Sequence, residues 1–315
     1  MSGARIEAGD LDGAGAPSEI LEFNKVLVGS LADAGWRFPP ASAQALRQAL
    51  SRNPPVYESP KASTIEVPAP HGAIPVRVIR AEEPKGVYIH CHGGGWTIGS
   101  PVGSDASSER IASRAGLTVA SIDYRLAPEN PYPAPVDDCE MAARWILENG
   151  LDVFGVERFA IGGESAGANL ALCALLRITA ERPGAIAAAN LSYGNYCLTM
   201  TPSQRHATGE VMITRDCLEW FYDQYVPDRA RRDDADVSPL FADLRGLPPV
   251  LLSVGSADSL LDDSVFLACR MFASGVDCEL QIVPGGEHTF DMAPVPVAQA
   301  AVEHIDEFLA KHIKG

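Results

Sequence analysis

One short motif, Gly163-Glu-Ser165-Ala-Gly167, constrains the fold more than any other part of the sequence. It matches G-x-S-x-G, it follows an apolar run that ends at Ile161, and a long apolar stretch begins at Ala166. The five letters occur by chance in many glycine-rich chains, but in this context they indicate a strand that turns sharply into a helix. Such a turn strains the backbone of the serine and exposes its hydroxyl, while small neighbours allow other segments to approach closely. The motif predicts an α/β fold with Ser165 as a nucleophile.

The residues on both sides of this motif alternate between strand-like and helix-like patterns. Short β-branched runs separated by Pro and Gly indicate opening strands at 64–67, 76–79 and 87–90. Because strand and helix then alternate, we expect a mostly parallel, twisted sheet flanked by helices. The expected helices span 104–115, 135–148, 166–180, 262–273 and 295–313, and the expected strands span 118–122, 158–161, 250–254 and 279–283.

Two regions depart from this alternation. Amphipathic helices are expected at 18–36 and 41–51, the second ending before Asn53-Pro54-Pro55, and the first ten residues are small and polar and are expected to fray. Between about 194 and 244 the chain is polar and aromatic, with a helix-like piece at 214–225 that follows no clear strand. We interpret this second region as a lid inserted into the catalytic domain.

A glycine loop, His92-Gly93-Gly94-Gly95-Trp96, follows the expected strand at 87–90. Preorganised backbone amides of this kind form an oxyanion hole, where a single donor contributes roughly 2.7–4 kcal/mol. The amide of Ala166 is a further candidate donor, because it lies at the N-terminus of the helix after the serine. The alternative is a turn without a chemical role. We expect His92 to shape this loop rather than to transfer protons.

A nucleophilic serine needs a base and an acid, and in this kind of fold they follow in the order Ser, Asp or Glu, His. Asp258 comes directly after the expected strand at 250–254, at the carboxyl edge where open α/β sheets assemble their sites. His288 lies in a loop after the strand at 279–283, whereas His304 and His312 lie in the last helix. Asp258 and His288 are therefore the predicted acid and base.

Nearby acidic residues receive structural interpretations. Asp262 and Asp263 fall where the next helix begins, so we expect them to cap it. The Asp137-Asp138 pair is expected to favour the start of another helix electrostatically. Glu287 either tunes His288 or is a solvated loop charge, and the second interpretation is favoured.

Three motifs together resemble the hormone-sensitive-lipase family of α/β-hydrolases: His92-Gly-Gly-Gly95, then Tyr124-Arg-Leu-Ala-Pro-Glu129, then Gly163-Glu-Ser-Ala-Gly167. Asp258-Ser-Leu-Leu-Asp262 and His288-Thr-Phe290 resemble the family's acid and base motifs. The resemblance, over about 87–290, implies an α/β-hydrolase domain at 56–315, with a helical cap built from the helices of 1–55 and the insertion at 194–244. It also implies a bacterial-type carboxylesterase and makes a homodimer reasonable. The commonest family motif has Asp where this chain has Glu164.

Charge and composition limit the classes of binding partner that this protein is expected to have. With 41 acidic against 25 basic residues, the formal charge of −16 opposes binding to nucleic acid or anionic membranes. The sequence contains no run of about 18 apolar residues, so membrane insertion is not expected. Seven scattered cysteines without a C-x-x-C pair indicate thiols in a reducing compartment, and no secretion signal is recognisable, so we expect a cytoplasmic protein. No metal-binding or nucleotide-binding motif indicates a cofactor or a metal.

The predicted reaction is hydrolysis of short- to medium-chain or aryl carboxylic esters through an acyl-enzyme. Amide or lactone hydrolysis by the same residues remains open. A non-catalytic small-molecule receptor is a further alternative, against which the presence of His288 argues. Four aromatic residues are candidates for lining the substrate pocket, although core packing is an equal alternative for each: Trp36, Trp96, Phe221 and Tyr225.

Overall fold

The computed structural model describes residues 13, 15–51 and 56–314. The strands form an eight-stranded sheet in the order β1-β2-β4-β3-β5-β6-β7-β8. The pairs β1–β2 and β2–β4 are antiparallel and the other pairs are parallel, which confirms the predicted mostly parallel sheet. The strands are β1 (Ala62–Ala69), β2 (Gly72–Ile79), β3 (Gly86–Cys91), β4 (Leu117–Ile122), β5 (Phe159–Glu164), β6 (Ala188–Ser192), β7 (Val250–Gly255) and β8 (Cys278–Val283).

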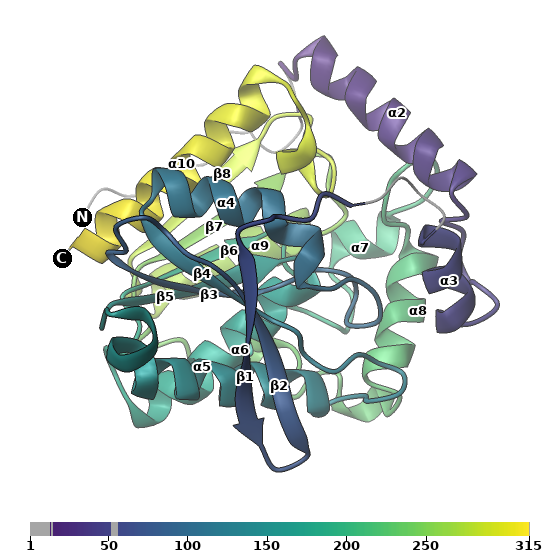
Figure 1. Ribbon diagram of the computed structural model, residues 1–315. Helices are drawn as coiled ribbons and strands as arrows, with labels where there is room; N and C mark the ends of the chain where they lie inside the picture. Colours follow the sequence, from purple (N-terminus) through teal and green to yellow (C-terminus); the bar gives the residue numbers. More distant parts are fainter. Residues whose placement is uncertain (1–12, 14, 52–55, 315) are drawn as a thin grey trace.

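Helices cover both faces of this sheet (Figure 1). One face packs against α5 (Ala134–Phe154), α6 (Ala166–Glu181) and α9 (Leu261–Ala273). The other face packs against α4 (Asp105–Arg114) and α10 (Pro296–Lys314). The predicted α/β-hydrolase fold is thereby confirmed, with apolar side chains buried on both faces as a parallel sheet requires.

Strand β6 is one element that the sequence patterns did not reveal. Its residues, Ala188-Ala-Asn-Leu-Ser192, contain none of the β-branched or aromatic types that mark strands. All five are buried between β5 and β7. Pairing on both edges and burial on both faces therefore make this segment a strand despite its low intrinsic propensity.

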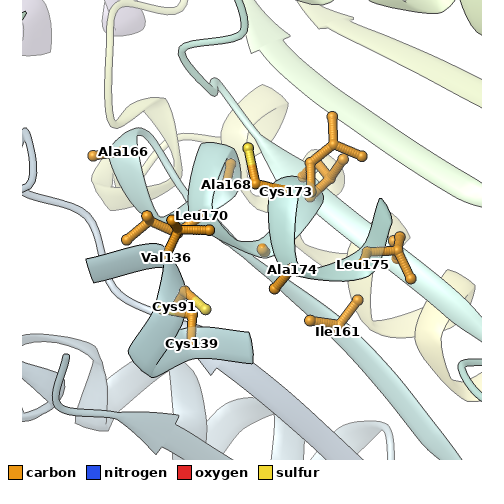
Figure 2. Close-up of a cluster of buried hydrophobic side chains, with 14 of the residues drawn as sticks. Cys91, Val136, Cys139, Ile161, Ala166, Ala168, Leu170, Cys173, Ala174 and Leu175 are labelled. Carbon is orange, nitrogen blue, oxygen red and sulfur yellow. The ribbon is translucent and has the colours of Figure 1, made fainter. Parts of the chain in front are cut away.

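Helix α6 packs closely against the sheet because much of its inner side consists of small residues. Figure 2 shows Ala166, Ala168 and Ala174 of α6 beside Leu170, Cys173 and Leu175, all of them buried. The same cluster includes thiols from β3 and α5. Six cysteines of the chain are buried and Cys269 is exposed, and all seven are free.

Four helices gather at one end of the sheet: α2 (Ser18–Asp33), α3 (Ala43–Leu50), α7 (Pro202–His206) and α8 (Arg215–Tyr225) (Figure 1). Aromatic contacts join the N-terminal region to α8, since the Phe38 ring lies 5.7 Å from Trp220 and 5.4 Å from Phe221. The 3-10 turns η2 (Arg229–Arg231) and η3 (Pro239–Phe241) complete the segment 194–244. The fraying expected for the first ten residues, and the Asn53-Pro54-Pro55 segment, lie outside the described residues.

The expected helix-capping role of Asp262 and Asp263 is wrong. Helix α9 begins after Leu260 and has no side-chain cap. Asp263 is fully buried and accepts hydrogen bonds from the amides of Tyr196 and Cys197, at 2.7 and 2.9 Å, and from Thr201 and Gln204, at 2.9 and 2.6 Å. Because these donors all lie in the segment 194–244, Asp263 anchors that segment to α9.

Replacing Asp263 with alanine is expected to lower the free energy of unfolding by about 3 to 5 kcal/mol, because several buried donors lose their acceptor. Urea denaturation followed by circular dichroism measures this loss. The matched control is Asp262→Ala, because Asp262 is only partly buried and accepts from the Ser203 amide at 2.7 Å. A similar loss in both variants would contradict the anchoring role.

Candidate active site

Ser165 lies at the turn between β5 and α6 in a backbone conformation with positive φ, with φ of 56° and ψ of −123°. Non-glycine residues rarely adopt such angles, which cost of order 1–3 kcal/mol and persist only when the surroundings enforce them. A methyl group at Gly163 or Gly167 would overlap the carbonyl of Cys91. These glycines therefore allow β3 to approach the turn closely, which brings the loop after β3 next to Ser165.

The structure brings Ser165, His288 and Asp258 together at the carboxyl edge of the sheet. His288 lies in the loop after β8, and its Nε2 is 3.0 Å from Ser165 Oγ. Its Nδ1 is 2.9 Å from Asp258 Oδ2, and Asp258 follows β7. The two side chains are 3% and 0% exposed, so water scarcely competes for their hydrogen bond. This is the order nucleophile, base, orienting carboxylate that proton transfer from a serine requires.

The glycine loop lies against the nucleophile. A Cβ at Gly93 would lie 3.5 Å from the Cβ of Ser165, and Gly94 and Gly95 have φ values of 120° and 56°, which favour glycine. Among the described residues, no acceptor takes a hydrogen bond from the amides of Gly93, Gly94, Gly95 or Ala166. These four backbone donors are therefore not used within the described part of the protein, and Gly93 and Ala166 are the two nearest to Ser165.

His92 supports this loop from behind. Its Nδ1 is 2.8 Å from the carbonyl of Gly93, and its ring stacks on Tyr124 with centroids 4.3 Å apart. Burial lowers the pKa of His92 to about 4, so the ring is neutral near pH 7. These contacts agree with a role in shaping the loop.

A cavity of about 730 Å³ opens beside Ser165. Trp36, Trp96 and Phe221 line it, together with other apolar residues such as Met212 and Leu218. Tyr225, the fourth aromatic candidate, does not line it, so that prediction is wrong. The ring of Tyr225 is fully buried and stacks on Trp96 with centroids 4.5 Å apart, so the core-packing alternative applies to it.

Glu164 points to the sheet face opposite α6. One carboxylate oxygen is 2.7 Å from His90 Nε2, and the other accepts a hydrogen bond from Ser104 at 3.1 Å. Burial alone would raise the pKa of Glu164, but the charge and hydrogen bonds of His90 and the hydrogen bond of Ser104 outweigh it, so the pKa lies below its usual value. Glu164 is therefore ionised at neutral pH beneath the nucleophile.

The structure contradicts two further expectations. Asp138 is buried and binds the Arg125 guanidinium through two hydrogen bonds of 2.8 Å, so it is an ion-pair partner rather than a helix-start charge; Asp137 does lie in the first turn of α5. Glu287 is 5% exposed and not solvated. It accepts hydrogen bonds of 3.4 Å from the amides of Met212 and His288.

Burial, and then the charge of Asp258, raises the pKa of Glu287 to about 7 from a usual value of 4.5. Between these pH values the folded protein holds a proton that the unfolded chain has lost, so the free energy of unfolding falls as pH rises. Glu287→Gln removes this dependence. We expect the variant to gain stability relative to the native protein, by on the order of 3 kcal/mol between pH 4.5 and 8. Urea denaturation at both pH values measures the difference, and a difference independent of pH would contradict it.

Among residues 13, 15–51 and 56–314, no group of three or more His, Cys, Asp or Glu side chains is arranged to hold a metal ion. No helix within the same residues is both long and apolar enough to span a bilayer.

The mostly parallel sheet, the strained serine turn and the three hydrogen-bonded side chains define the class of α/β-hydrolases. Residues 88–292 match the family described as alpha/beta hydrolase fold. The chain belongs to the hormone-sensitive-lipase family within this class.

Known proteins similar to this chain include a carboxylic ester hydrolase, LipN, from Mycobacterium tuberculosis. It is 36% identical over 242 residues, which cover 72% of this chain and 63% of LipN. A hyperthermophilic esterase from the archaeon Pyrobaculum calidifontis has a similar structure, with a TM-score of 0.83, 28% identity and coverage of 92% and 97% of the two chains. An esterase described as a bacterial hormone-sensitive lipase family member has a TM-score of 0.80 and 30% identity, with coverage of 95% and 99%.

Proposed function

We propose that this protein is a serine carboxylesterase that hydrolyses carboxylic esters through an acyl-enzyme. The observation that carries the proposal is the continuous path of hydrogen bonds from Ser165 Oγ through His288 to Asp258. Backbone amides of the glycine loop and of Ala166, which donate to no acceptor among the described residues, would supply the second requirement of acyl transfer. The similarity to LipN, which is named as a carboxylic ester hydrolase, supports ester bonds as the target.

Each step uses a group already in place. His288 Nε2 accepts the proton of Ser165 as Oγ attacks the ester carbonyl, and amides of the glycine loop and of Ala166 stabilise the oxyanion. The imidazolium then gives its proton to the leaving alcohol. A water molecule enters, His288 removes its proton, and the acid is released as Ser165 recovers its hydrogen. Asp258 keeps the Nδ1 proton of His288 in place throughout.

The proposed substrates are esters of short to medium acyl chains or of aryl alcohols. A cavity of about 730 Å³ lined mainly by apolar side chains supports this class. For a series of p-nitrophenyl esters from acetyl to dodecanoyl, we expect kcat/KM to reach its maximum at an acyl chain of about eight carbons or fewer. A maximum at dodecanoyl would overturn the proposed substrate class. The absence of both ester hydrolysis and fluorophosphonate labelling would overturn the proposal that the protein is a serine esterase.

The cytoplasmic location and the homodimer expected from the sequence remain predictions. Size-exclusion chromatography with light scattering tests the second.

A further inference from the structure

The cavity beside Ser165 continues past the nucleophile to the sheet face that α4 and α10 cover. We call this part the inner chamber, and define it by Tyr88, Arg110, Glu164, Asn190, Tyr193 and Asp291. Apolar residues of the two helices, Ile111 and Ile305, also line it. Tyr193 connects the inner chamber to the reacting groups, because its ring contacts the His288 ring edge to face with centroids 4.8 Å apart.

Two carboxylates face the inner chamber. Asp291 lies three residues after His288, and its Oδ1 accepts a hydrogen bond of 2.8 Å from the hydroxyl of Tyr193. Burial raises the pKa of Asp291, the nearby charge of Glu164 raises it further, and Arg110 lowers it. Asp291 is nevertheless an exposed residue, and it borders the cavity. The three charged groups are therefore close enough to influence one another.

The positive charge near these carboxylates is already paired. Arg110 binds the carboxylate of Asp306 and the carbonyl of Val302. Glu164 is paired with His90, whereas the hydrogen bond from Tyr193 is the single one to the Asp291 side chain within the described part of the chain. The inner chamber consequently retains an excess of negative charge at Asp291.

A neutral acceptor adds to this charge. Asn190 is 5% exposed, and its side-chain oxygen has no hydrogen-bond partner among the residues that the structure describes. Buried polar atoms are usually paired, so this unpaired oxygen leaves the partial negative charge of the Asn190 amide uncompensated at the wall of the cavity.

We propose that the inner chamber is a subsite for a cationic group, a protonated or quaternary amine, on one arm of the ester substrate. The proposal rests on the proposed esterase function and deepens it by naming a substrate class. A carboxylate on the cavity wall whose charge no cationic side chain neutralises attracts a cationic substrate and repels an acidic one. Asp291 is then a specificity-determining residue, whereas Ser165, His288 and Asp258 perform the chemistry.

Matched esters that differ only in charge test this proposal. For the acyl arm, the pair is p-nitrophenyl 4-(trimethylammonio)butanoate and its neutral isostere, p-nitrophenyl 5,5-dimethylhexanoate. For the alcohol arm, the pair is butyrylcholine and 3,3-dimethylbutyl butyrate. In one of the two pairs, we expect the native protein to favour the cation in kcat/KM by about tenfold or more, a ratio that corresponds to about 1.4 kcal/mol.

Asp291→Asn removes the charge and keeps an oxygen that accepts from Tyr193. We expect the cation preference to fall to near unity in this variant, while Asp233→Asn, a control at an exposed position outside the cavity, keeps the native ratio. Because each ratio is taken within one variant, a general loss of activity cancels. A native ratio near or below one in both pairs, or an unchanged ratio in Asp291→Asn, would overturn the subsite. Failure to hydrolyse any of the four esters, together with no fluorophosphonate labelling, would instead overturn the esterase proposal, and the subsite with it.

Discussion

Replacing Ser165 with alanine is expected to reduce kcat for p-nitrophenyl butyrate by about 10⁴-fold or more, with the fold retained. The alanine lacks the oxygen that attacks the ester, whereas the backbone turn between β5 and α6 is held by its neighbours. Gly163 and Gly167 pack against the carbonyl of Cys91, and this close approach does not involve the serine side chain. Thermal unfolding and near-ultraviolet circular dichroism are therefore expected to match those of the native protein.

A fluorophosphonate probe gives an independent measurement for the same variant. The native protein should carry the label on Ser165 in a peptide mass map, and Ser165→Ala should carry none. Ser113→Ala, which changes an exposed serine on α4, is the matched control and should be labelled fully. Native-like turnover in Ser165→Ala, or a label at another residue, would show that the nucleophile has been misassigned.

Asp258→Asn is expected to lower kcat by about 10⁴-fold, with little change in folding. The reason lies in the second oxygen of Asp258, which accepts a hydrogen bond of 2.8 Å from the amide of Leu260. An asparagine will keep its carbonyl oxygen on that amide, so its NH₂ group will face His288 Nδ1. The histidine must then carry its proton on Nε2, where it can no longer accept the proton of Ser165.

Asp262→Asn is the control for this experiment, because Asp262 belongs to the same sequence motif but accepts from the Ser203 amide. Its kcat is expected to remain within a few-fold of the native value. Steady-state kinetics on one ester series compare the variants, and the tautomer of His288 can be read from ¹⁵N chemical shifts of the imidazole. Native kcat in Asp258→Asn, or a larger loss in Asp262→Asn, would be inconsistent with the assigned acid.

The sequence was a reliable guide where structure follows from local pattern. The apolar run before Gly163 and the apolar stretch after Ala166 correctly predicted the strand and helix that flank Ser165. The segment Ala188–Ser192 had no such pattern, and only pairing with β5 and β7 makes it a strand. The local pattern was strong around Ser165 and weak at Ala188–Ser192, so the conformation of the latter segment depended on strands distant in sequence.

Misjudged side chains share a different cause. The interpretations of Asp263 and Glu287 rest on neighbours along the chain, where an acidic residue at a helix start suggests a cap and one in a loop suggests solvent. In the folded protein, Asp263 bonds to residues about 60 positions away, and Glu287 bonds to Met212. Such contacts leave no signal in the spacing of nearby residues.

By itself, the sequence determined the α/β class, the position of Ser165 on a turn between strand and helix, and the order in which an acid and a base follow it. These properties depend on backbone propensity, apolar periodicity and chain order, all of which can be read directly from the order of residues along the chain. Only the tertiary structure decided which side chains border the cavity, that Glu164 pairs with His90, and that Asp291 brings an unbalanced charge close to His288. The physical reason is that charge and burial depend on distances between segments far apart in the chain, which exist only once the chain has folded.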